Sequence, residues 1–298
     1  MAAAVVAVAG GVAATGLVGD DPAVSTARRV EDAPSASPAS ATDDPAGVVA
    51  AGGPSSMPRP DKTVEDLAVA LPTTRGNVSI AFFDPSSGRM LSAGDDHEYV
   101  TASIVKVDIL ATLLLRAQDE QRPLTADEKA KASVMIRVSD NNATWALWDV
   151  IDKADGLSAA NARLGLVETV ATPVSWGLTR TTPADQLRLL HAVTSQESVL
   201  NAESRSYLLE LMNSVRSDQT WGVSVAADAG TPTPLKNGWL PRDATGLWVV
   251  NSLGSVVYEG KTLLVAVLSD DQTSMNAGIK QIEGAVEAAI PAAAGKLD

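Results

Sequence analysis

The chain has 298 residues, 45% of them hydrophobic and 20% charged, so it can bury a large core. A formal net charge of −13 and the absence of any Lys/Arg run argue against a nucleic-acid partner. Cysteine is absent, which excludes disulfides, thiol catalysis and thiolate metal ligands. The two histidines, His97 and His191, have no partner at metal-ligand spacing, so we expect structural roles for both and neither a metal nor an organic cofactor.

The N-terminal part of the chain has two compositional blocks. Residues 1–19 are rich in Ala and Val and carry no charged side chain, which is typical of a secretory hydrophobic region or a weak membrane span, although a positive n-region is missing. Residues 20–62 are rich in Pro, Ala, Ser and Asp, which is typical of a disordered tether. We therefore expect a secreted or membrane-tethered extracytoplasmic protein whose folded domain spans 63–298.

The rest of the chain predicts an α+β fold. A helix is expected over 64–71, helical periodicity extends from 103 to about 225, and a last amphipathic helix is expected over 275–290. Five apolar runs bounded by turn residues predict strands, at 78–83, 90–91, 246–251, 256–258 and 262–268. Strands at both ends of a helical insertion imply an antiparallel sheet of about five strands, flanked by N- and C-terminal helices. An all-helical lobe is inserted, with a cleft at its junction with the sheet.

The first candidate site residues lie where the helical block begins. Ser103 and Lys106 are three residues apart, so on a helix they share one face, and a buried lysine could take a proton from the serine. The alternative is a capping serine beside a lysine whose stem packs on the surface. This Ser-x-x-Lys spacing is common, so the rest of the chain decides between the two.

Two further motifs follow in a defined order, Ser139-Asp-Asn141 and Lys236-Asn-Gly238. Together with the first motif they match the signature set of class A β-lactamases and penicillin-binding proteins. The chain resembles that superfamily over residues 63–295, including the hairpin before the serine, the Thr181-Thr-Pro183 helix start and the closing strands. The resemblance implies a β-lactamase/transpeptidase-like fold.

The resemblance also implies the roles of four catalytic residues. Ser103 would be the acylated nucleophile, and Lys106 its base. Ser139 would pass a proton toward the leaving nitrogen, and Lys236 would pair with a substrate carboxylate while making Lys106 less basic.

Substrate-binding roles are implied for four more residues. Asn141 would hold the lysine base and bind the substrate amide, while Gly238 would allow close approach to the strand. Asn237 replaces a hydroxyl residue of the family and could still donate to a carboxylate. The backbone N–H of Trp239 would complete an oxyanion hole, and its indole would either narrow the cleft or cover the sheet edge.

The loop before Thr181 departs from the family. Class A β-lactamases carry there a Glu that activates the water for deacylation, whereas residues 157–184 of this chain hold a single carboxylate, Glu168. We interpret Glu168 as a surface residue, with a displaced deacylation base as the alternative. Thr179 stands where the family's Asp would be, so we expect no Arg–Asp pair at the neck of this loop.

The sequence therefore predicts an exported serine hydrolase that forms an acyl-enzyme at Ser103. Its substrate would be a small-molecule β-lactam or a cell-wall peptide. The alternatives are a penicillin-binding or D-Ala-D-Ala peptidase-like protein with slow deacylation, or a cell-wall-binding domain without catalysis.

Overall fold

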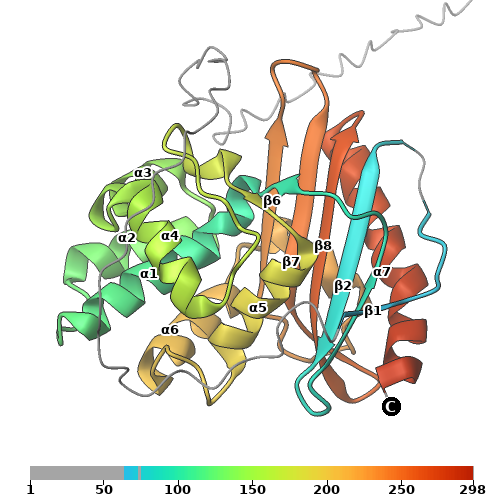
Figure 1. Cartoon of the computed structure of the whole chain (residues 1–298), viewed down its shortest axis with the longest axis horizontal. Helices are drawn as coiled ribbons and strands as arrows, with labels where there is room; N and C mark the ends of the chain where they lie inside the picture. Colours follow the sequence, from blue (N-terminus) through green and yellow to red (C-terminus); the bar gives the residue numbers. More distant parts are fainter. Residues whose placement is uncertain (1–63, 73–74, 298) are drawn as a thin grey trace, which may run out of the picture.

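The computed structural model describes residues 64–72 and 75–297, and it has an α+β architecture with two lobes (Figure 1). One lobe is a twisted sheet with the long helix α7 on its outer face, and the other is a block of helices on the opposite side. The sheet has six strands in the order β1-β3-β2-β8-β7-β6. Their bounds are β1 Val64–Asp66, β2 Asn77–Asp84, β3 Arg89–Ala93, β6 Leu235–Pro241, β7 Trp248–Tyr258 and β8 Lys261–Gln272.

The helical lobe is inserted between β3 and β6 in the chain. Its helices are α1 Val105–Asp119, α2 Ala126–Arg137, α3 Asn141–Val150, α4 Lys153–Leu164, α5 Pro183–Thr194 and α6 Ala202–Asn213, and α7 spans Met275–Leu297. Short 3-10 helices and a two-stranded ladder connect them, namely η1 Ala102–Ile104, η2 Trp176–Leu178, η3 Ser217–Gln219, η4 Val223–Ala226, β4 Tyr99–Val100 and β5 Arg180–Thr181. Nearly every residue of α1 is buried, so α1 is the central helix of this lobe.

The sheet is buried on both faces, which explains its continuous apolar strands. Along β2, Ile80 and Phe82 pack in the core beneath α7, whereas Ala81 and Phe83 pack in the core of the helical lobe. Successive side chains of a strand point to opposite faces, so each strand contributes to both cores. The predicted α+β fold with an inserted helical lobe is therefore confirmed.

The predicted N-terminal helix is wrong. Residues Val64–Asp66 form β1, which pairs in parallel with β3, with Val64 opposite Met90. Leu67 then donates its N–H to the Ser92 carbonyl at 2.6 Å. The apolar spacing that predicted a helix is satisfied instead by an extended segment over the α7-side core, because pairing with an open sheet edge satisfies the backbone there.

Two strand predictions also change. The two runs predicted at 246–251 and 256–258 form the single strand β7, and β6 adds a strand at the edge of the sheet. The turn predicted at 259–261 is present, because Glu259 and Gly260 have φ of 49° and 77°, as a two-residue hairpin turn requires. The last helix extends past the predicted end at residue 290 to Leu297.

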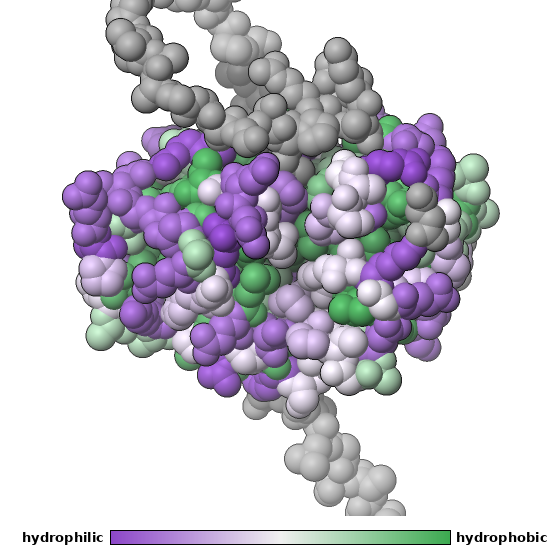
Figure 2. All heavy atoms as spheres, turned by 90° about the horizontal axis from the view of Figure 1, so that it is seen from below, coloured by the Kyte–Doolittle hydropathy of each residue, from purple (hydrophilic) through white to green (hydrophobic). Residues whose placement is uncertain are grey.

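The surface seen from below is mostly hydrophilic, with hydrophobic residues in small patches (Figure 2). Within residues 64–72 and 75–297, no helix is both long enough and apolar enough to cross a bilayer. The segments 1–19 and 20–62, predicted to be a signal or anchor and a tether, lie outside the described residues.

Candidate active site

Ser103 lies in a tight turn at the entrance of α1. The residue before it, Ala102, has a φ of 48°, a left-handed conformation that costs an L-residue about 1–2 kcal/mol and must be held by its surroundings. The Thr101 N–H donates to the Thr179 carbonyl at 2.8 Å, and the Asn251 amide donates to the Thr101 carbonyl at 3.1 Å. These bonds fix the turn and leave Ser103 half-buried where the two lobes meet.

Strand β6 packs directly on this turn at Gly238. A Cβ atom at Gly238 would lie 2.7 Å from the backbone nitrogen of Ser103 and 2.8 Å from both the Ile104 nitrogen and the Thr101 oxygen. Because all three are backbone atoms, no side-chain rotation could relieve such contacts. The structure therefore gives Gly238 a second role beside the predicted one, since it lets the edge strand reach the serine turn.

Two fully buried lysines meet at Ser139. The Lys106 ammonium nitrogen, Nζ, lies 2.6 Å from the Ser139 carbonyl, 3.1 Å from the Ser139 hydroxyl and 2.9 Å from Asn141 Oδ1. The Lys236 Nζ lies 3.0 Å from the same hydroxyl and 2.9 Å from the Asn237 carbonyl. Residues from three separate motifs thus form one connected site, with the Ser139 hydroxyl between the two amines.

Burial makes both lysines weak cations. It is the largest cause that lowers the pKa of Lys106 well below its usual value; the charge of Lys236 lowers that pKa further, and the Asp140 carboxylate opposes the shift. Burial lowers the pKa of Lys236 from 10.5 to about 7. Lys106 is therefore neutral near pH 7 and able to accept a proton, while Lys236 is partly charged.

The turn between α2 and α3 delivers Ser139 and Asn141 to the site. Ser139 has a φ of 58°, so this second strained residue also lies at the site. Asp140 caps α3, because its carboxylate accepts from the Ala143 N–H at 2.7 Å. The middle residue of the motif is thus structural, and its neighbours carry the chemistry.

Asn237 and Trp239 point away from the lysine side of β6. The Asn237 amide donates at 2.9 Å to both the Gln219 and the Trp221 carbonyl, which commits its two hydrogens. The indole of Trp239 packs against that of Trp221 with ring centroids 5.8 Å apart, on the α7 side of the sheet. The side chains of Asn237 and Trp239 therefore brace the outer side of β6, and we assign neither of them a direct substrate contact.

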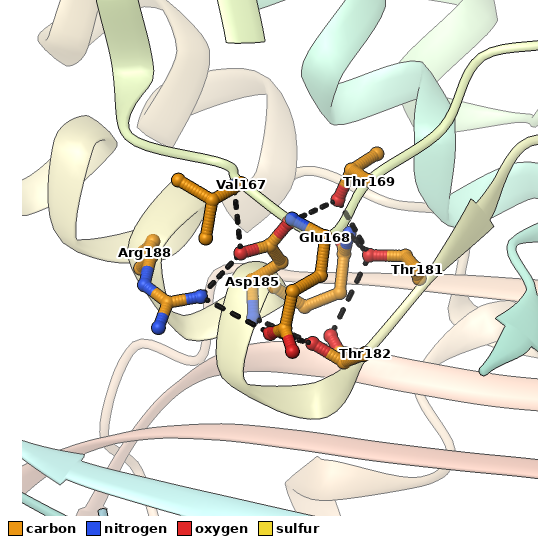
Figure 3. Close-up of polar contacts among 8 residues, drawn as sticks. Val167, Glu168, Thr169, Thr181, Thr182, Asp185 and Arg188 are labelled. Atoms are coloured by element: carbon orange, nitrogen blue, oxygen red, sulfur yellow. Dashed lines mark hydrogen bonds and ion pairs between the residues drawn. The ribbon is translucent and has the colours of Figure 1, made fainter. Parts of the chain in front are cut away.

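A buried ion pair closes the neck of the loop between α4 and α5 (Figure 3). The Asp185 carboxylate accepts from the backbone N–H of Val167 at 3.2 Å and of Glu168 at 2.8 Å, and from the Thr169 hydroxyl at 2.7 Å. It also pairs with Arg188, and both side chains are at most 3% exposed. The expectation of a neck without an Arg–Asp pair is therefore wrong, because both partners come from α5 rather than from the loop.

Glu168 belongs to this neck. Its carboxylate accepts from the Thr182 hydroxyl at 2.9 Å and lies 3.4 Å from an Arg188 nitrogen, and its side chain is 41% exposed. Among the described residues, no carboxylate forms a hydrogen bond or ion pair with Lys106. The part of the chain that the structure describes also holds no group of three or more acidic or histidine side chains suited to a metal ion.

Trp176 is a site residue that the sequence did not single out. Its ring centroid lies 4.9 Å from Lys106 Nζ, and its edge contacts Trp145 of α3 at a centroid distance of 5.9 Å. Trp176 is 7% exposed and lies in η2, within the loop that Asp185 closes. A tryptophan in a loop otherwise made of small and polar residues was the available signal.

A family model described as the beta-lactamase enzyme family matches residues 125–290, which is more than half of the chain. The chain belongs to this family. The matched range includes Ser139 and Lys236 and begins after Ser103 and Lys106, which the structure places in the same site. None of the curated proteins compared with the chain matches it.

Solved structures of beta-lactamases share the fold. A beta-lactamase from Burkholderia vietnamiensis is 21% identical, with a TM-score of 0.63 over 74% of this chain and 92% of its own. The TLA-1 extended spectrum beta-lactamase is 17% identical, with a TM-score of 0.65 over 74% and 93%. A mutant of PBP-A, solved as an acyl-enzyme complex with penicillin G, is 22% identical, with a TM-score of 0.61 over 75% and 92%.

Proposed function

We propose that the protein is a serine hydrolase that forms an acyl-enzyme at Ser103 with a β-lactam or a related cell-wall peptide. The observation that carries this proposal is the pair of buried lysines that share the Ser139 hydroxyl beside the serine turn. Burying two amines together is costly unless their altered acidity is used, which favours chemistry over a binding-only domain.

The acylation step follows from these positions. Neutral Lys106 takes the proton from Ser103 Oγ while that oxygen attacks the substrate carbonyl carbon. The backbone N–H groups of Ser103 and Trp239 stabilise the oxyanion, and collapse of the intermediate breaks the carbon–nitrogen bond. The proton passes from Lys106 through the Ser139 hydroxyl, 3.1 Å away, to the leaving nitrogen. Lys236 holds the substrate carboxylate.

Slow deacylation is the outcome that the contacts favour. Hydrolysis of the ester needs a water activated by a base, and the one acidic residue of the loop, Glu168, is engaged with Thr182 and Arg188. The neighbour PBP-A was captured as an acyl-enzyme with penicillin G. We therefore favour a penicillin-binding or peptidase-like protein over an efficient β-lactamase. The Ala- and Val-rich segment 1–19 supports an extracytoplasmic location, free or membrane-tethered.

Intact mass spectrometry of the full chain mixed with benzylpenicillin tests this function. A mass increase of one penicillin that is absent in Ser103→Ala is the expected result, with drug loss measured in parallel. A persistent adduct with little drug loss supports slow deacylation, whereas rapid drug loss would show a working β-lactamase. An unchanged mass in the parent protein would contradict acylation by this substrate, and an adduct on Ser103→Ala would contradict the assignment of the nucleophile.

A further inference from the structure

We infer that Trp176 determines how long the acyl-enzyme at Ser103 survives. This inference rests on the proposed function and deepens it, because it names the residue that controls the second half of the reaction. It starts from the contact between the indole ring and Lys106, whose centroid-to-Nζ distance is 4.9 Å.

The position of Trp176 is fixed from the serine side. The carbonyl of Trp176 accepts from the Thr179 N–H at 3.2 Å, and the Thr179 carbonyl accepts from the Thr101 N–H at 2.8 Å. Thr101 stands two residues before Ser103, so a chain of backbone hydrogen bonds joins the indole-bearing turn to the nucleophile turn. The ring therefore cannot move far without disturbing the serine.

The opposite side of the ring is held by the helix that carries the second motif. Trp145 of α3 meets Trp176 edge to face, with an angle of 63° between the rings. The same helix begins at Asn141, whose side-chain oxygen accepts from Lys106. Trp176 is thus wedged between the serine turn and α3, and it covers the lysine from the loop side.

The indole provides no base for a hydrolytic water. Its face is apolar, and its one polar atom, Nε1, is a donor only. Nε1 is buried and has no hydrogen-bond partner among the described residues, and neither do the hydroxyls of Thr101 and Thr179. A buried donor of this kind seeks an acceptor, which points to a polar group of a bound acyl chain rather than to an attacking water.

The ring also affects the protonation of the base. Water admitted beside Lys106 would solvate the ammonium and raise the pKa that burial now depresses. The loss of the ring face would act in the opposite direction, because an aromatic ring attracts a cation. Burial is the largest cause of the lowered pKa, so removal of the ring should move the pH midpoint of acylation upward.

Decay of the penicillin adduct tests this inference. In Trp176→Ala, water gains access to neutral Lys106, and we expect the adduct to decay at least about tenfold faster than in the parent while acylation changes by less than about threefold. Trp176→Phe keeps an aromatic ring and should decay within about threefold of the parent rate. Trp248→Ala, which removes a tryptophan on the α7 side of the sheet, should leave the decay rate unchanged.

The outcomes separate this inference from the proposed function. An unchanged decay rate in a folded Trp176→Ala protein overturns the inference alone, whereas the lack of any adduct on the parent overturns the proposed function. If Trp176→Ala does not fold, Trp176→Leu provides the same comparison with a smaller loss of volume. A merely structural role would lower the unfolding temperature without separating decay from acylation and without shifting the pH midpoint, and that result would also overturn the inference.

Discussion

Substitution of Gly238 by Ala should damage acylation through the backbone of the serine turn. The new Cβ would lie 2.7 Å from the Ser103 nitrogen, and ordinary contact begins at 3.4 Å, so the strand and the turn must separate by about 0.7 Å. Overpacking of this kind costs about 1–3 kcal/mol, and a displacement near 1 Å at a reacting group lowers the rate by about a hundredfold. We therefore expect acylation to fall about ten- to a hundredfold.

The assay is the rate of adduct formation with benzylpenicillin, followed by intact mass, together with thermal unfolding. The unfolding temperature should fall by about 2–4 °C for each kcal/mol. Gly295→Ala is the matched control, because a Cβ there meets nothing within 4 Å, and it should change neither quantity appreciably. A Gly238→Ala protein that acylates and unfolds like the parent would refute the argument that β6 packs directly on the nucleophile turn.

Three further predictions concern charged residues. Acylation should rise with pH as Lys106 loses its proton, and the affinity for a carboxylate-bearing substrate should fall above about pH 7 as Lys236 loses its charge, so a pH profile flat in both quantities would contradict these roles. The folded pKa of Lys236 lies below its unfolded value, so the parent should gain stability between about pH 7 and pH 10; Lys236→Met should remove that slope in urea titrations, raise the free energy of unfolding at pH 7 by up to roughly 5 kcal/mol and abolish acylation. Asp185→Ala should cost about 3–5 kcal/mol in the same titrations because Arg188 is left buried and unpaired, whereas Glu168→Gln, at a 41% exposed side chain, should cost less than about 1 kcal/mol and leave adduct decay unchanged; a faster or slower decay would restore Glu168 as a candidate base.

The sequence predicted the site better than it predicted the surroundings. Ser103, Lys106 and Ser139 could be identified because each motif combines a reactive group with a fixed spacing, and such spacings survive in any fold that meets them. The hairpin turn at Glu259 and Gly260 was readable for a similar reason, since the conformation it needs is a local property. These are features that short stretches of chain specify alone.

Other features depended on contacts between distant segments. Val64–Asp66 became a strand because the edge of β3 was open to it, and no local pattern contains that information. The direction of the Asn237 side chain depends on which face of β6 meets the lysines. The ion pair of Asp185 with Arg188 looks like an ordinary helix-surface spacing until the loop is seen to close over it.

The position of β2 between β3 and β8 has a consequence for how the protein is made. Asn77 and Asp270 lie 193 residues apart in the chain and share a hydrogen bond of 2.7 Å at one end of this pairing. While a ribosome is still producing the intervening helices, one edge of the β2–β3 hairpin has no neighbour. The sheet can be completed only when β8 emerges near the end of synthesis, so the growing chain spends most of its translation without its central strand pair.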